Sequence, residues 1–180
     1  MRIWLLAFVY FAVADFASGA PVEEDWQAVW ADEFEGTGQP DPEKWEYESG
    51  FVRNNEEQFY TTKRLKNTRV KNGCLVIEGH RESPVASDLT KEPAKKPPKI
   101  QYTSASLHTK GLASWKFGRI EVRYHSFRSA KAKSPGGNPF HKPHYLILNL
   151  ALGGNWGGKI DDSIFPARFL VDYVRVYRKK

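Results

Sequence analysis

Cysteine is almost absent from this chain of 180 residues, which holds only Cys74. A single cysteine cannot form a disulfide within the chain, and it excludes a zinc site built on several thiolates. Signals for long helices are also missing: there is no amphipathic repeat of helical period and no heptad, while 14 glycines and 11 prolines interrupt the sequence. Beyond the first twenty residues no apolar run is long enough to span a membrane.

The amino terminus has the layout of a secretory signal. Arg2 supplies positive charge, an unbroken apolar run follows from Ile3 to Ala14, and residues 17–20 (Ala-Ser-Gly-Ala) offer a small-residue cleavage site. The run is too short to cross a bilayer. We therefore expect residues 1–20 to be a signal peptide and residues 21–180 to form one secreted domain, extracellular or periplasmic.

The formal net charge of +6 does not by itself indicate a nucleic-acid partner. Part of the excess comes from one cluster that is interleaved with prolines and reads as a solvated loop. Its lysines are Lys91, Lys95, Lys96 and Lys99. Without a nucleic-acid-binding motif, scattered basic residues are a weak signal, so we expect no nucleic-acid binding.

What the chain does contain is many aromatic residues and short segments with strand character. The segment 117–123 alternates cleanly, with Ile120 and Val122 on one face and charged residues on the other. Asn72-Gly73 predicts a two-residue hairpin turn inside the segment 69–77. Further strands are expected at 26–35, 102–109, 145–150 and 169–177. Short strands at turn-punctuated spacing predict a β-sandwich or barrel.

Seven sequence blocks occur in an order that resembles a known family. They are WADEFEG, NNEEQFYT, NGCLVIEGHRE, YTSASLHTKG, FGRIEVR, HYLILNLALGGNWGG and VDYVRVY. This series resembles the glycoside hydrolases of family 16, most closely the laminarinase branch, which cuts β-1,3-glucans. The resemblance covers residues 26–178. It implies an all-β, concanavalin-like jelly-roll sandwich around a glycan cleft, with β-1,3- or mixed-linkage glucan as the partner.

The resemblance also implies that a segment is missing. The family carries its retaining chemistry on one strand with the pattern Glu-x-Asp-x-x-Glu, and this sequence has no such pattern. After FGRIEVR the chain runs through residues 124–133 straight into residues 134–140, which resemble the loop before YLILN. We therefore expect several central strands of the concave sheet to be absent and no catalytic residues to be present. Open strand edges would then favour self-association.

Three interpretations of the function follow from this departure. The first is a defective hydrolase that has lost an internal segment, and the second is a non-catalytic glucan-binding module or sensor. The third is an active enzyme whose carboxylates have moved. Glu46 and Glu48 could be a pair on one strand face, but such pairs are mostly solvated and nothing else points to catalysis there. The abrupt junction favours the first, because a sensor would be expected to keep its sheet intact.

The resemblance implies five substrate-binding residues. Trp156, between glycines, is expected to stack on a sugar, although it could instead fill the core beneath its loop. Asn149 interrupts an apolar strand and needs a partner, either a sugar or a backbone group. Asn55 and Glu56 would bind sugar hydroxyls, with loop capping as the alternative, and Arg81 is either a cleft residue or a solvated charge.

A structural calcium site is the one cofactor that the resemblance implies. Glu33, Gly73 and Asp172 occupy places similar to the family's calcium site, and calcium takes carboxylate and backbone oxygens as ligands. Asp172 is otherwise unusual inside an apolar strand, with the capping of a neighbouring turn as the alternative. His141 and His144 flank a proline and lack a third ligand, which argues against a transition-metal site.

Overall fold

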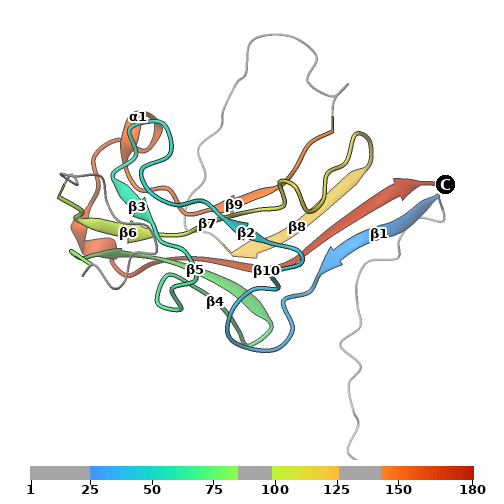
Figure 1. The fold of residues 1–180 in the computed structure, drawn as a ribbon, viewed down its shortest axis with the longest axis horizontal. Coiled ribbons are helices and arrows are strands. Elements are labelled where there is room, and N and C mark those ends of the chain that lie inside the picture. Colours follow the sequence, from blue (N-terminus) through green and yellow to red (C-terminus); the bar gives the residue numbers. More distant parts are fainter. Residues whose placement is uncertain (1–24, 85–98, 126–142) are drawn as a thin grey trace, which may run out of the picture.

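The computed structural model describes residues 25–84, 99–125 and 143–180 as two β-sheets packed face to face (Figure 1). The expected signal peptide lies outside these residues, as do most of the lysine-rich loop and the junction at residues 126–142. Within the described parts, no helix is long and apolar enough to cross a membrane. The all-β jelly-roll expectation is confirmed.

The larger sheet is built around β10 (Ala167–Lys179), the longest strand. One edge of β10 pairs antiparallel with β8 (Arg119–His125). The other edge pairs with β5 (Cys74–Arg81) through residues 167–171 and with β1 (Trp26–Asp32) through residues 174–179. The sheet continues from β5 to β4 (Thr68–Lys71) and β6 (Tyr102–Ser104), and from β6 to β3 (Gln58–Tyr60).

The smaller sheet has the order β2 (Glu46–Tyr47), β7 (Ser106–His108) and β9 (Ile147–Asn149) in the described part of the chain. Leu107 and Leu148 point from this sheet into the core, where they meet Leu75, Ile77 and Val174 of the larger sheet. All five side chains are less than a tenth exposed. Burying this apolar surface between the sheets is the main force that holds the sandwich closed.

The turn of the hairpin between β4 and β5 is the one that the sequence predicts. Asn72 and Gly73 both have positive φ angles, 54° and 72°, as a two-residue turn of this kind requires. The register Lys71↔Cys74 confirms the tight connection.

The segment 102–109 differs from the single strand that was expected. It divides at Ala105 into β6, which belongs to the larger sheet, and β7, which belongs to the smaller one. Its small hydroxyl side chains allow this crossing because each finds a partner: Ser104 Oγ donates to the carbonyl of Leu150 at 2.7 Å, and Thr103 Oγ1 donates to Glu82 at 2.5 Å. Polar residues can therefore be buried where the chain changes sheets.

Glu82 joins three parts of the fold, and its carboxylate makes the stability of the protein depend on pH. Its carboxylate accepts hydrogen bonds from Arg64, Lys66 and Thr103, and its side chain is only 18% exposed. Burial raises the pKa of Glu82, but these three donors outweigh it and bring the pKa from 4.5 to about 2. Because the folded pKa is depressed, the stabilisation is complete above pH 4.5 and is lost as the pH falls towards 2.

We therefore expect Glu82→Gln to lower the free energy of unfolding at pH 7 by about 2 kcal/mol. Denaturant melts from pH 7 to pH 2 should show a shallower loss of stability below pH 4.5 than in the wild type. Glu43→Gln, at an exposed position, is the control and should follow the wild-type profile. Identical slopes for Glu82→Gln and the wild type would contradict this assignment.

Candidate functional site

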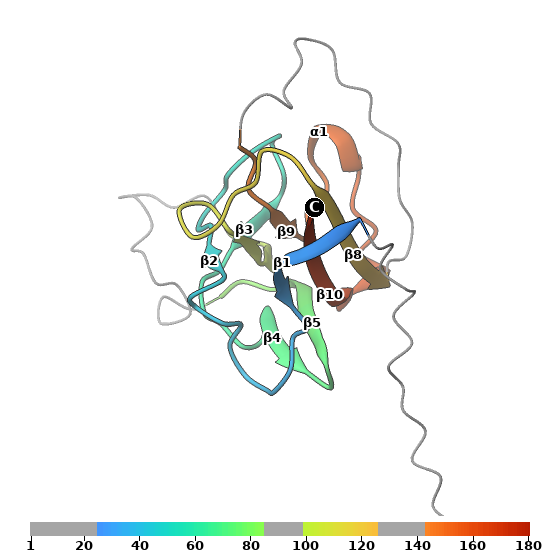
Figure 2. The ribbon, with the colours of Figure 1, turned by 90° about the vertical axis from the view of Figure 1, so that its right-hand side faces the viewer.

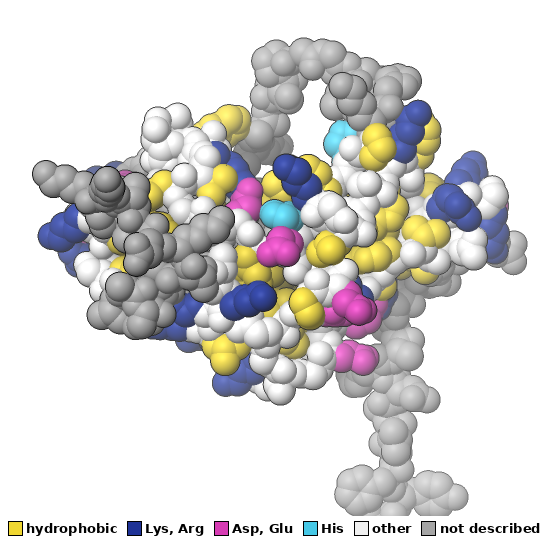
Figure 3. Space-filling model, in the orientation of Figure 1, with side chains coloured by type: hydrophobic (Ala, Val, Ile, Leu, Met, Phe, Trp, Pro, Cys, Tyr) yellow, Lys and Arg dark blue, Asp and Glu magenta, His cyan; other side chains and the backbone are white. Residues whose placement is uncertain are grey.

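The outer face of the smaller sheet carries a ladder of polar and aromatic side chains. Since Leu107 and Leu148 point into the core, their neighbours along each strand point the opposite way. The register places Ser106 opposite Asn149, and it places His108 between Glu46 and Ile147. Acidic, histidine and hydrophobic side chains accordingly lie together over β2, β7 and β9 in Figure 3.

Glu48 is fixed at one end of this ladder. Its carboxylate forms a close ion pair with the Arg53 guanidinium and accepts a hydrogen bond from Ser106 Oγ at 2.5 Å. The positive charge of Arg53 therefore balances the negative charge of the Glu48 carboxylate, and both carboxylate oxygens accept hydrogen bonds. Glu46 lies on the same strand face and is exposed.

A second network lies beside the first and is centred on Tyr60, whose side chain is fully buried. The Tyr60 hydroxyl donates to Glu56 at 3.0 Å and accepts from Asn149 Nδ2 at 2.8 Å. Gln58 also donates to Glu56, at 2.8 Å, while its carbonyl accepts from the Leu152 backbone N–H. Burial raises the pKa of Tyr60, so its phenol stays protonated and remains a donor at neutral pH.

Two loops meet at the rim of this network, and a glycine makes the contact possible. The Asn155 N–H donates to the carbonyl of Asn54 at 2.9 Å, and Asn55 Nδ2 donates to the Asn155 side chain at 3.2 Å. A Cβ atom at Gly154 would lie 2.7 Å from the Asn54 carbonyl oxygen, so a larger residue there would push the loops apart.

This loop contact presents Trp156 on the short helix α1 (Gly154–Gly157). The Trp156 side chain is 71% exposed, so the alternative in which it fills the core is wrong. An exposed ring on a fixed loop is suited to stacking on an apolar face of a ligand.

The five residues expected to bind substrate thus divide into two groups. Glu56 and Asn149 belong to the Tyr60 network, and Asn55 and Trp156 belong to its rim. Asn149 bonds to a side chain, the Tyr60 hydroxyl, whereas the sequence analysis expected a sugar or a backbone group as its partner. Their role in binding a ligand stays a prediction.

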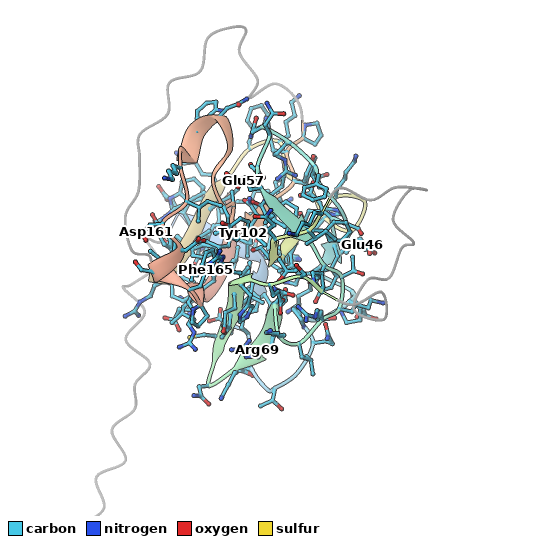
Figure 4. The ribbon with its side chains drawn as sticks, turned by 90° about the vertical axis from the view of Figure 1, so that its left-hand side faces the viewer. Glu46, Glu57, Arg69, Tyr102, Asp161 and Phe165 are labelled. Carbon is cyan, nitrogen blue, oxygen red and sulfur yellow. The ribbon has the colours of Figure 1, made fainter. Side chains whose placement is uncertain are left out.

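Arg81 belongs to a different cluster. Its guanidinium lies 3.3 Å from the Asp162 carboxylate, which also accepts from the Tyr102 hydroxyl at 2.8 Å. The Tyr102 ring stacks on Phe165 with centroids 5.4 Å apart. Figure 4 shows Tyr102 and Phe165 away from Glu46.

Sequence reasoning missed Arg53, Tyr60 and Ser106 as members of the site, and it considered Glu48 only as a possible carboxylate pair with Glu46. The signal for Glu48 was present, because Tyr47 packs on the core and its two neighbours must therefore share the outer face. Nothing in the sequence pairs Tyr60 with Asn149, since 89 residues separate them. Taken together, the site offers fixed donors, fixed acceptors and an exposed ring, an arrangement suited to holding a polyhydroxylated ligand.

The strand register places the three residues of the expected calcium site near the same stretch of β10 in the larger sheet. β5 and β1 pair with the same edge of β10 but stop at Val171 and Val174, which leaves a gap at Asp172 and Tyr173. Gly73 directly precedes β5 and Glu33 directly follows β1, so the end of β1 and the start of β5 lie beside this gap.

The carboxylates of this gap are engaged by arginines. Arg123 lies 3.3 Å from Asp172, and Arg175 bonds Glu33 through two nitrogens at 2.8 and 2.9 Å. The hydrogen bond from Arg175 holds the pKa of Glu33 below its ordinary value. No group of three or more metal-binding side chains occurs in the described ranges. Calcium binding therefore stays a prediction that relies on Asp172 and backbone carbonyls, in competition with two guanidinium groups.

Comparisons with known proteins agree with this architecture. No family model matches the chain. It is 27% identical to a β-glucanase from Rhodothermus marinus over 85% of each chain. It is 26% identical to the clotting factor G alpha subunit of Tachypleus tridentatus and 28% identical to a glucan endo-1,3-β-glucosidase from Niallia circulans. These two relatives are longer, and the chain spans only 34% and 22% of them.

A solved structure of a non-specific endo-β-1,3(4)-glucanase of family 16 matches the fold with a TM-score of 0.72 and 27% identity. The match covers 88% of this chain and 93% of that one. The two-sheet fold and its polar, ring-edged face define a jelly-roll protein of the glucanase type. Within that class, the chain is similar to the laminarinases of glycoside hydrolase family 16, as the sequence resemblance indicated.

The calcium prediction can be tested by thermal melts. If calcium binds only the folded protein through Asp172, millimolar calcium should raise the melting temperature of the wild type by several degrees. Asp172→Ala should lose that increase, whereas Glu46→Ala, an exposed acid on the other sheet, should keep it. Equal calcium-induced shifts in Asp172→Ala and the wild type would rule out this assignment.

Proposed function

We propose that the chain is an exported β-glucan-binding relative of the family 16 glucanases that does not hydrolyse glucan by the family mechanism. The observation that carries this proposal is the position of β8 and β9. These strands are consecutive in the described chain, yet each lies at an edge, β8 in the larger sheet and β9 in the smaller one. A block of strands between them would extend both sheets, and the catalytic motif belongs to such a block by resemblance.

The lengths of two alignments support the same interpretation. The alignments with the Rhodothermus and Tachypleus proteins extend over 257 and 251 positions, whereas this chain has 180 residues. The relatives therefore contribute residues that have no counterpart here. The alignment with the Niallia protein extends over 167 positions and requires no long insertion.

The chemistry of the remaining carboxylates also favours a protein without hydrolytic activity. Retaining hydrolysis requires a nucleophile and a proton donor about 5–5.5 Å apart on either side of the scissile bond. Glu48 is neutralised by Arg53, and Glu56 is occupied by Gln58 and Tyr60. These contacts fix both groups as hydrogen-bond acceptors, which is a binding role. The interpretation with relocated carboxylates therefore has the least support.

The ligand class follows from the relatives. A mutant of the structurally similar family 16 glucanase holds 1,3-β-D-cellobiosyl-glucose at its active site. The surface formed by Asn55, Glu56, Asn149 and Trp156 offers this chain the means to bind one part of such a chain of glucose units. We therefore propose β-1,3- or mixed-linkage glucan as the ligand.

The binding module or sensor remains the second candidate. The observation in its favour is the set of fully partnered polar side chains around Tyr60, which a merely damaged enzyme has no need to keep in order. Both candidates bind glucan, but a dedicated binding module should be a cooperative fold, whereas a damaged enzyme should melt broadly. A sharp calorimetric transition without ligand would place the second candidate first.

The first functional prediction concerns hydrolysis. Residues 21–180 should release no reducing sugar from laminarin or from a mixed-linkage glucan above a heat-inactivated control, because the nucleophile and proton donor are both absent. Activity that disappears in Glu46→Gln, Glu48→Gln or Glu56→Gln would overturn the proposal.

Trp156 is expected to contribute to laminarin binding. Trp156→Ala should weaken laminarin binding roughly three- to tenfold in isothermal titration while leaving the melting temperature unchanged, because the exposed ring contributes stacking but little packing. Phe117→Ala is the matched control, since Phe117 is 69% exposed but lies on the loop before β8. Equal affinity of Trp156→Ala and the wild type would remove Trp156 from the binding surface.

A further inference from the structure

β8 is an edge strand with one side open. Among the described residues it pairs with β10 alone, and Figure 2 shows it at the outer side of that strand. Every second residue of an edge strand directs its N–H and C=O groups away from the sheet, where another strand can bind them. β8 has seven residues and no proline, so nothing in its backbone blocks such pairing.

The two faces of β8 carry different side chains. Glu121 lies on the outer face, where it accepts a hydrogen bond from the Tyr177 hydroxyl at 3.3 Å. Tyr124 lies on the core side, where its ring meets Phe169 at 5.8 Å between centroids. Strand alternation then places Arg119 and Arg123 with Glu121, and Ile120 and Val122 with Tyr124. Ile120 and Tyr124 remain 44% and 50% exposed, so their apolar surface is only half covered.

We propose that β8 docks antiparallel onto β8 of a second copy of the chain, with the twofold axis at Val122. In this register Glu121 lies opposite Arg123 of the second copy, and the same pair forms again across the axis. Ile120 lies opposite Tyr124 of the second copy on the core side. Opposite charges and aromatic–β-branched pairs are the cross-strand neighbours that stabilise a sheet. The docking joins the two larger sheets into one and covers both open edges.

The charge pattern of β8 selects this register over its neighbours. A shift of the axis to residue 121 would place two Glu121 carboxylates opposite each other and Arg119 opposite Arg123. A shift to residue 123 would place two Arg123 guanidinium groups together. Registers that bring the polar face of one copy beside the apolar face of the other would expose apolar side chains. Among the axes at residues 121, 122 and 123, only the axis at Val122 places Glu121 opposite Arg123 and brings no like charges together.

The ion pairs already present on β8 do not oppose the docking. Arg123 lies 3.3 Å from Asp172, and Arg119 pairs with Glu121. The Arg123 side chain is 62% exposed, so its existing pair contributes little stability and can share the guanidinium with a second carboxylate. In the dimer Arg123 would lie between Asp172 of its own chain and Glu121 of the second copy.

β9 is a weaker candidate for the same contact. It is three residues long, and an antiparallel axis at Leu148 would place Ile147 opposite Asn149, which joins an apolar residue to a polar one. No charge on β9 selects a register. The inference about β8 rests on strand geometry and charge alone, so it holds or fails independently of the proposed function.

Charge reversal with rescue tests the interface on residues 21–180. Sedimentation equilibrium should show a dimer for the wild type. Glu121→Arg and Arg123→Glu should each raise the dimer dissociation constant about tenfold or more, because like charges then face each other twice. The double variant Glu121→Arg with Arg123→Glu restores unlike pairs and should restore the dimer.

Arg168→Glu is the matched control, because Arg168 also forms an exposed ion pair with a carboxylate, Glu78 at 3.4 Å, but lies on β10. It should leave the dimer intact. Thermal melts establish that each variant folds, and Glu121→Gln replaces any reversal that does not, with a smaller loss expected. A monomeric wild type, a dimer that is insensitive to both reversals, or a dimer that dissociates only in Ile147→Lys would overturn the β8 interface.

Discussion

The structure depends on the hydrogen bonds along β10. This one strand binds β8 along one edge and both β5 and β1 along the other, so it connects segments from the beginning, middle and end of the chain. Its apolar residues Val171 and Val174 also point into the core against the smaller sheet. A substitution that interrupts β10 would therefore disturb the sheet and the core together. On the edge that binds β1 and β5, the same strand leaves residues 172 and 173 unpaired between the end of β1 and the start of β5, which adjoin Glu33 and Gly73 in the chain.

The polar face combines the smaller sheet and its loops with β3, the strand of the larger sheet that carries Gln58 and Tyr60, while the rest of the larger sheet serves mainly as a frame. That face depends on one buried hydroxyl. Tyr60 links Asn149 of β9 to Glu56, which lies in the loop before β3. The Gln58 side chain accepts a hydrogen bond from the backbone N–H of Leu152. Tyr60, Gln58 and Asn149 all have hydrogen-bond partners, and the bonds from Asn149 to Tyr60 and from Leu152 to Gln58 join distant segments of the chain. The face is therefore held in shape before any ligand arrives, which lowers the entropic cost of binding.

Much of the fold can be predicted from the sequence because strand alternation and turn chemistry are local. The Asn72-Gly73 turn and the alternation of β8 both follow from neighbouring residues. What the sequence does not supply is which strands pair. The division at Ala105 depends on acceptors at Leu150 and Glu82, which lie far along the chain. For the same reason the sequence located Asn149 and Arg81 as candidate site residues but did not identify Tyr60 and Asp162 as their partners.

The central claim is that this fold has kept a glucan-binding surface without glucan hydrolysis. A nuclear magnetic resonance titration of residues 21–180 with a β-1,3-linked glucose oligosaccharide observes both halves of that claim in one sample. The account predicts that the Trp156 indole and the Asn55 and Asn155 side-chain amide signals shift with sugar concentration, while the anomeric signals of the oligosaccharide stay constant over days. New reducing-end signals, or shifts confined to residues outside this surface, would contradict it.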